Sequence, residues 1–214
     1  MTSSHPAVSL QVDHLVVATS DLESAVDELA QRLGVRASPG GSHPGIATRN
    51  CLLSFGDAAY LEVIGPDPEQ TPPDFPRPFG IDDLTAPRLV TWAIGEPDLE
   101  GRIATARAAG YDPGEILPLS RQSPGGLIEW RLTRRAEYGG GGLVPFLIDW
   151  GTTPSPALSA QKGCTLVDLR GEHPDPAEVQ RMLAALGVAM EVTEGEAPAL
   201  VATLATPNGE IEIR

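Results

Sequence analysis

The feature that most constrains this chain is a repeated pattern in which one strand and one helix are followed by further strands. VDHLVVAT at 12–19 is strand-like, and the helical pattern after it ends at Gly34. RLVTWAIG at 88–95 is strand-like as well, and its helical pattern ends at Gly110. The helices begin with nearly the same phrase, DLES in the first and DLEG in the second. A recurrence at about 75 residues is too wide for a solenoid and predicts a duplicated structural unit.

Further strands are expected after both helices. After the first helix they cover 35–38, 48–55 and 59–64, and after the second they cover 114–120, 127–133 and 143–150. A partial third copy follows, with a strand at 164–171, a helix at 175–188 and a hairpin around Asn208-Gly209. The pattern therefore predicts two βαβββ modules and a C-terminal βαββ half-module.

Proline-dense and glycine-rich stretches separate these units. The segment PDPEQTPPDFPRP cannot continue a sheet, and RRAEYGGGG at 134–142 is expected to be a loop. We place the first module at 10–65, a proline-rich linker at 66–87, the second module at 88–150, a second linker at 151–163 and the half-module at 164–214.

Acidic residues outnumber basic ones, with 29 against 15 and a formal net charge of −14. Such a surface repels phosphate backbones, so nucleic acid is not expected as a partner. No run reaches the roughly 18–20 apolar residues of a membrane helix, and no secretory signal stands at the N-terminus. Cys51 and Cys164 are interpreted as reduced, buried residues. We therefore expect a cytoplasmic protein without a membrane partner.

Five segments, in their order and spacing, resemble the vicinal oxygen chelate superfamily and in particular its glyoxalase-like domain proteins. They are VDHLVVAT, GSHPGIATRN at 41–50, YLEVIG at 60–65, EWRLT at 129–133 and PFLIDW at 145–150. The resemblance covers about residues 10–150. It implies an α+β fold in which two βαβββ modules pair into a cup-shaped mixed sheet. It also implies a small-molecule ligand and, commonly, a divalent metal whose ligands come from the first and last strands of each module.

The resemblance implies a particular set of metal ligands. His14 matches the first-strand ligand of module one, Glu62 the fourth-strand ligand, and Asp149 the last-strand carboxylate of module two. The fourth position falls on Trp92, or on Thr91 if the register slips by one, and neither is a usual metal ligand. One histidine and two carboxylates suit Zn²⁺, Ni²⁺, Mn²⁺ or Fe²⁺ and leave positions open for a substrate.

Strand alternation favours a meeting of His14 and Glu62. On the strand at 59–64, Leu61 and Val63 share one face and suit packing on the helix, which leaves Glu62 on the cup side. An unpaired carboxylate is costly to bury there, and His14 is its natural partner. The alternatives are a hydrogen-bonded structural histidine and a solvated carboxylate on an edge strand.

The same alternation in LIEWRLT places Arg131 in the cup, where its guanidinium would bind a carboxylate or an enolate. A structural ion pair with Glu129 or Glu62 is the alternative. Trp92 is expected either to wall the cup and stack on a flat substrate or to fill the core. Weaker candidates for substrate contact are Arg49, Asn50 and His43, the last of which also suits a plain turn.

Two functions from different classes follow. The first is a metal-assisted lyase or isomerase, in which the ion polarises neighbouring substrate oxygens and Glu62 or Asp149 moves the proton. The second is a metal-free module that sequesters an antibiotic or metabolite, which Trp92 at the missing ligand position favours. A purely structural or partner-binding role remains as a third alternative. An extradiol oxygenase is disfavoured because only one histidine stands on a predicted strand. Both modules lie in one chain, so we expect a monomer or a homodimer.

Overall fold

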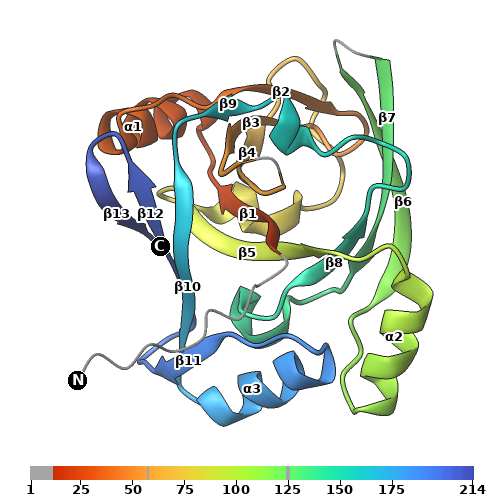
Figure 1. Ribbon diagram of the computed structural model, residues 1–214. Coiled ribbons are helices and arrows are strands. Elements are labelled where there is room, and N and C mark those ends of the chain that lie inside the picture. The colour runs from red at the N-terminus through yellow and green to blue at the C-terminus, as the bar shows by residue number, and fades with distance from the viewer. Residues whose placement is uncertain (1–11, 57, 124–125) are drawn as a thin grey trace.

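The computed structural model describes residues 12–56, 58–123 and 126–214, which form two β-sheets and three α-helices (Figure 1). The large sheet contains β1 (Val12–Ala18), β2 (Ser38–His43), β3 (Thr48–Ser54), β4 (Tyr60–Pro66), β5 (Arg88–Gly95), β6 (Glu115–Ser123), β7 (Gly126–Arg134), β8 (Phe146–Asp149) and β9 (Gln161–Lys162). The small sheet contains β10 (Thr165–His173), β11 (Glu191–Glu194), β12 (Ala199–Thr206) and β13 (Gly209–Ile213). The helices are α1 (Leu22–Leu33), α2 (Leu99–Ala108) and α3 (Pro176–Ala185), and the 3₁₀ turns are η1 (Pro78–Asp83), η2 (Gly139–Gly142) and η3 (Pro156–Leu158).

The large sheet joins the two repeats through their first strands. Its strand order is β2-β3-β4-β1-β5-β8-β7-β6, with β9 paired to β3. β1 and β5 pair antiparallel at the centre, while β1 pairs parallel with β4 and β5 pairs parallel with β8. The end strands β2 and β6 also approach each other, so the sheet curls into a half-barrel. The α+β fold with a cup-shaped mixed sheet is therefore confirmed.

Each α-helix begins at an aspartate that caps its N-terminus. Asp21 accepts a hydrogen bond from the Ser24 N–H, and Asp98 accepts one from the Gly101 N–H. Asp175 caps α3 in the same way. A side-chain cap of this kind contributes about 1 kcal/mol to helix stability. The repeated DLE phrase is thus a repeated helix start.

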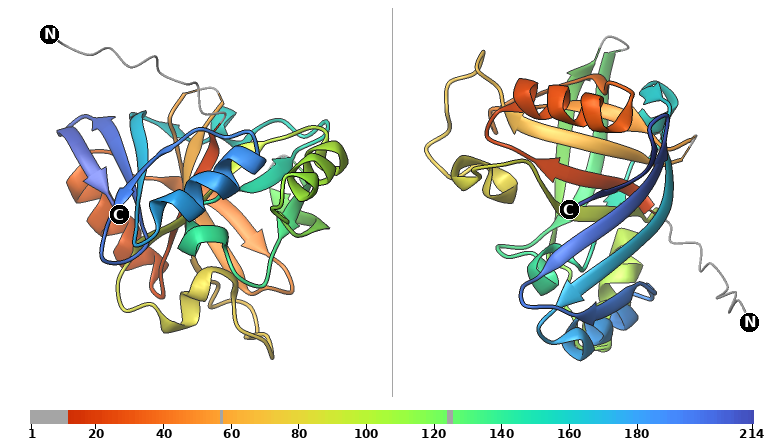
Figure 2. Two further views of the ribbon diagram at one scale, coloured as in Figure 1. Left: turned by 90° about the horizontal axis from the view of Figure 1, so that it is seen from below. Right: turned by 90° about the vertical axis from the view of Figure 1, so that its left-hand side faces the viewer.

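The two faces of the large sheet carry different cores. Leu61 and Val63 on the outer face pack with α1, as the alternation predicted, and belong to the main hydrophobic cluster. The small sheet also packs on this outer side, because β12 contacts β5 and β13 contacts α1 (Figure 2). A second, smaller cluster that includes Val16, Ile64 and Phe146 lies on the inner face of the curl. The sheet therefore has one face for stability and one that encloses a cavity.

Three local expectations need correction or extension. β2 begins at Ser38, whereas the pattern predicted a strand over 35–38. The glycine-rich segment is not an open loop, because Gly139–Gly142 forms a 3₁₀ turn in which Gly139 and Gly142 are buried. β11 adds one short strand to the expected βαββ order. Among the described residues, no helix is long and apolar enough to cross a membrane.

Candidate functional site

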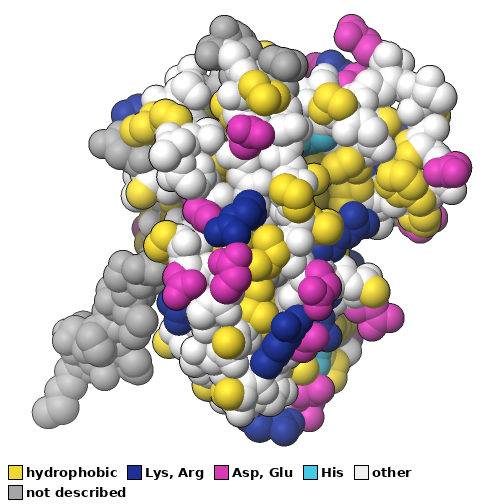
Figure 3. All heavy atoms as spheres, turned by 90° about the vertical axis from the view of Figure 1, so that its right-hand side faces the viewer, with side chains coloured by type: hydrophobic (Ala, Val, Ile, Leu, Met, Phe, Trp, Pro, Cys, Tyr) yellow, Lys and Arg dark blue, Asp and Glu magenta, His cyan; other side chains and the backbone are white. Residues whose placement is uncertain are grey.

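A cavity of about 540 Å³ opens inside the curl of the large sheet. In the space-filling view, hydrophobic side chains gather in the upper half of the molecule, and a histidine side chain shows between them (Figure 3). Leu117, Trp130 and Phe146 are among the apolar lining residues. The polar ones are His14, His43, Thr48, Asn50, Tyr60, Glu62, Ser120, Arg121, Thr133, Arg134 and Tyr138. The cavity therefore combines an apolar wall with a small set of polar groups, as small-molecule sites usually do.

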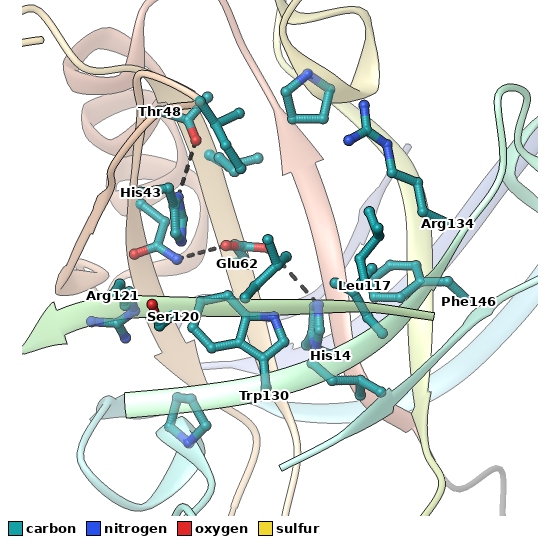
Figure 4. Close-up of a pocket in the computed structure, with 18 of the residues that line it drawn as sticks. His14, His43, Thr48, Glu62, Leu117, Ser120, Arg121, Trp130, Arg134 and Phe146 are labelled. Carbon is teal, nitrogen blue, oxygen red and sulfur yellow. Dashed lines mark hydrogen bonds and ion pairs between the residues drawn. The ribbon is translucent and has the colours of Figure 1, made fainter. Parts of the chain in front are cut away.

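Glu62 and His14 meet in this cavity from neighbouring parallel strands (Figure 4). The His14 Nε2 atom lies 3.8 Å from Glu62 Oε2. On the other side of the carboxylate, the Asn50 amide donates a hydrogen bond to Glu62 Oε1 at 2.6 Å. Glu62 is 8 % exposed and His14 4 %, so water screens the pair little.

Asp13 holds the opposite edge of the His14 ring. Its Oδ1 atom lies 2.6 Å from His14 Nδ1, and its Oδ2 accepts a hydrogen bond from Trp150 Nε1 at 3.0 Å. Neighbouring side chains of a regular strand point to opposite faces. The pairing of β1 with β5 is irregular between Val12 and His14, and at this irregularity the two neighbours come into contact. Tyr60 stacks on the His14 ring with centroids 4.8 Å apart, which fixes its plane.

His43 is a second imidazole in the cavity. It ends β2, and its Nδ1 atom lies 3.0 Å from Thr48 Oγ1. Burial lowers the pKa of His43, and the nearby charge of Glu62 opposes this shift only in part. The imidazole is therefore neutral at pH 7. Its ring meets Trp130 edge-on, at a centroid distance of 6.3 Å.

Two loops meet over the cavity through aromatic rings. Phe79 in η1 stacks on Tyr138, with centroids 5.5 Å apart. Burial raises the pKa of Tyr138 to about 12, so its hydroxyl keeps its proton at neutral pH. Phe79 has a φ of 65°, a left-handed conformation that is uncommon for a bulky side chain. The proline-rich and glycine-rich connections thus both contribute to the cavity wall.

Arg131 and Asp149 do not face the cavity. Arg131 pairs with Asp149 at 2.7 Å and with Glu100 of α2 at 2.7 Å, on the other side of β7. The cavity side of β7 instead presents Trp130 and Leu132. The expectation that Arg131 projects into the cup is therefore wrong. The expectation that Asp149 lies beside His14 as a metal ligand or proton carrier is wrong as well. The face assignment failed because the apolar side chains of β7 wall the cavity, whereas those of β4 pack on a helix.

Trp92 and Arg49 also lie outside the cavity. Trp92 is fully buried in the main cluster, and its Nε1 donates to the Leu143 carbonyl at 2.8 Å. Arg49 pairs with Glu23 of α1 at 2.9 Å. The expectation that Trp92 walls the cup is thus wrong, and the alternative, that it fills the core, is correct. The expected substrate contact at Arg49 is also wrong, because this side chain lies outside the cavity. Of the expected site residues, the structure brings together His14, His43, Asn50 and Glu62.

Several cavity residues were missed from the sequence. Tyr60 shares a face with Glu62 by simple alternation, so that signal was present. Trp130 was missed because the expected alternation of this strand placed its neighbour Arg131 in the cavity instead. Arg121 carries no local signal, because its contact is with Gly40 at the far end of the sheet. Asp13 contacts His14 from outside the cavity lining, and this contact depends on a strand irregularity that periodicity does not reveal.

The described residues do not fit the expected metal centre. His14 and Glu62 supply two donor side chains, while the strands of the second module that face the cavity core present Ala93, Phe146 and Ile148. Across the part of the chain that the structure describes, no group of three His, Cys, Asp or Glu side chains could hold an ion. A catalytic zinc site has three protein ligands as a rule. His14 and Glu62 therefore provide one ligand fewer than such a site needs.

A curled sheet built from two βαβββ units around a partly apolar cavity defines a small-molecule-binding protein of the vicinal oxygen chelate type. The chain matches the family described as a glyoxalase-like domain over residues 12–187, and it belongs to that family. A search of curated proteins gives no match.

Solved structures share this fold at low sequence identity. A hypothetical protein from Staphylococcus aureus has a TM-score of 0.60 at 14 % identity and covers 95 % of this chain and 84 % of its own. A 4-hydroxymandelate synthase variant from Streptomyces coelicolor has a TM-score of 0.54 at 15 % identity. This match covers 95 % of this chain and 62 % of the synthase chain. A weaker match, which does not by itself establish a shared fold, is a variant of a methylmalonyl-CoA epimerase from Streptomyces coelicolor in complex with 2-nitronate-propionyl-CoA. Its TM-score is 0.46 at 19 % identity, and the match covers 67 % of this chain and 100 % of the epimerase chain.

Proposed function

We propose that the cavity binds a small oxygenated metabolite and that Glu62 moves a proton at a carbon next to a carbonyl, as an isomerase or lyase does. The observation that carries this proposal is the buried row Asp13–His14–Glu62, of which His14 and Glu62 line the cavity. Proton abstraction needs a base within hydrogen-bond reach of the reacting carbon and a group that returns or accepts the proton. Glu62 suits the first role and His14 the second.

The contacts of the row assign a task to each group. The Nδ1–H of His14 faces Asp13, so Nε2 is the ring atom that exchanges a proton on the cavity side. Asn50 holds one oxygen of Glu62 and leaves the other turned toward His14. Tyr60 and Phe146 exclude water from the imidazole. No step of this proposal uses a metal ion, because the described donor set falls one ligand short.

A second candidate is a protein that binds the same kind of molecule without transforming it. The apolar positions Ala93, Phe146 and Ile148 on the second module favour this function, because they offer packing and no chemistry. Asn50 also occupies one oxygen of the candidate base. The two candidates differ in one measurable property, which is exchange of a substrate proton with solvent.

The test is deuterium exchange at the carbon next to the carbonyl, followed by NMR in D₂O for a panel of small oxo and hydroxy compounds. We expect the native protein to catalyse exchange and Glu62→Gln to slow it at least 100-fold, the usual range for loss of a general base. The ligand dissociation constant should change little. Glu129→Gln, an exposed carboxylate on β7, is the matched control. Exchange that persists in Glu62→Gln contradicts the role of the base, and binding without exchange in the native protein supports the second candidate.

The proposal also covers the oligomeric state of the protein and the cell compartment in which it works. One chain supplies every residue of the row, so activity is expected of a monomer or a homodimer. Both cysteines are free, with Cys164 buried and Cys51 half-buried, which suits a reducing cytoplasm.

A further inference from the structure

We infer that Arg121 binds a carboxylate of the ligand, so that the cavity takes a small organic acid with an apolar body. This inference rests on the proposed small-molecule function and names the substrate class. It begins from a charge that has no counterion among the residues that the structure describes.

Arg121 is a buried cation in the cavity wall. Its side chain, on β6, is 6 % exposed. Burial lowers the pKa of its guanidinium, but an arginine keeps its charge in proteins. The only hydrogen bond described for the guanidinium runs from Nη1 to the Gly40 carbonyl oxygen at 3.0 Å. Four of its five N–H donors are therefore not used by a described contact.

The nearest candidate counterion is already engaged. No Asp or Glu among the described residues lies within 4.0 Å of the Arg121 guanidinium. Glu62 influences its pKa from across the cavity, but Asn50 holds Oε1 of that carboxylate and His14 faces Oε2. A buried charge without a partner is costly, and a ligand anion would remove the cost. By contrast Arg134, the other cationic lining residue, is exposed to solvent.

A chain of hydrogen bonds sets the distance between this cation and the proposed base. Arg121 binds the Gly40 carbonyl, and the next residue, Gly41, donates its N–H to Asn50 Oδ1 at 2.9 Å. Asn50 in turn donates to Glu62. The path crosses β2, β3 and β4, so the guanidinium lies about two strand spacings, roughly 10 Å, from the carboxylate. A ligand can therefore bind Arg121 with its acid group while its carbonyl reaches Glu62.

The wall between the two ends is apolar. In Figure 4 the Trp130 ring lies between Arg121 and His14, and its edge contact with His43 fixes its position. A flat or branched hydrocarbon body would pack there. A carboxylate is favoured over a phosphate, because a phosphate monoester carries nearly two charges and Glu62 shares the cavity. One guanidinium fork matches one carboxylate.

The experiment compares three probes of one shape, 3-phenylpropanoate, 3-phenylpropanamide and phenethyl phosphate. Binding is followed by tryptophan fluorescence, since Trp130 and Trp150 line the cavity. We expect the native protein to bind the acid at least tenfold more tightly than the amide, as a charge-assisted hydrogen bond would produce. Arg121→Met should abolish that difference and leave amide binding unchanged, which also shows that the variant is folded. Arg107→Met, which removes an exposed arginine that pairs with Glu115 of β6, should behave as native.

Each other outcome overturns the inference. Equal binding of acid and amide by the native protein removes the carboxylate anchor and leaves Glu62 and its exchange test untouched. Tighter binding of the phosphate than of the acid overturns the choice of carboxylate. Absence of saturable binding by all three probes overturns the organic-acid class. If Arg121→Met does not fold, Arg121→Lys decides, because a point charge without the fork should weaken acid binding at least threefold and amide binding not at all.

Discussion

Single residues in the cavity depend on which strands are neighbours. His14 and Glu62 are far apart in the chain, but β1 and β4 pair directly, and their register places His14 opposite Tyr60 and Val16 opposite Glu62. The two side chains therefore lie diagonally on one face. His43 reaches the same cavity from β2, where burial keeps its imidazole neutral. The lowered pKa of His43 makes the free energy of unfolding depend on pH.

Replacing His43 by Gln should flatten the pH dependence of stability as the pH falls below about 7. Burial holds the pKa of His43 in the folded protein below the ordinary histidine value of 6.5. As the pH falls through 6.5, the unfolded chain gains a proton that the folded protein does not bind, so the free energy of unfolding decreases. The loss levels off below the folded pKa. Urea unfolding at several pH values measures it. His173→Gln, on β10, is the control, and an unchanged slope in His43→Gln contradicts the prediction.

Whole elements were placed more reliably than their faces. Strands β7 and β8 were expected, and the strand order of the second module repeats that of the first. However, β7 turns Trp130 rather than Arg131 into the cavity. The glycine-rich turn η2 was expected to be a loop and instead packs against β5. Gly142 has a φ of 102°, and a Cβ there would lie 1.9 Å from the Val90 carbonyl oxygen. Glycine is required at this contact.

Gly142→Ala should lower the free energy of unfolding by about 3 kcal/mol or more, because backbone strain and a clash with backbone add together. Gly110→Ala is the matched control. Gly110 also has a positive φ, of 89°, but no atom lies within 4 Å of its built Cβ. Its substitution should cost only about 1 kcal/mol of strain. Chemical denaturation of both variants checks the difference, and equal losses would show that the approach to Val90 is unimportant.

The whole molecule is held by one main cluster that crosses both sheets. Trp92 of the large sheet and Leu200 of the small sheet belong to it, together with Leu143 from the segment between η2 and β8. A cluster shared in this way should make the two sheets unfold together. The division of the chain at residues 66–87 and 151–163 stays a prediction about sequence units, and it does not imply separate stability.

Leu200→Ala should therefore destabilise the entire chain by about 2–5 kcal/mol, the usual cost of a large-to-small change in a core. Far-UV circular dichroism, which reports both sheets, and tryptophan fluorescence, which reports the large sheet, should show coincident transitions. Leu158→Ala, at a side chain that is 56 % exposed, should change stability little. Two separated transitions would contradict a shared core.

The sequence by itself determined the repeated modules, the helix starts and the meeting of His14 with Glu62. These depend on periodicity within one module, where a strand has a period of two and a helix one of 3.6. Tertiary structure alone decided the outward face of Arg131, the contact of Asp13 with His14 and the approach of Arg121 to Gly40. Each depends on a strand irregularity or on the closing of β2 toward β6. Alternation shows which residues share a face, but which face is inside depends on how the sheet curls.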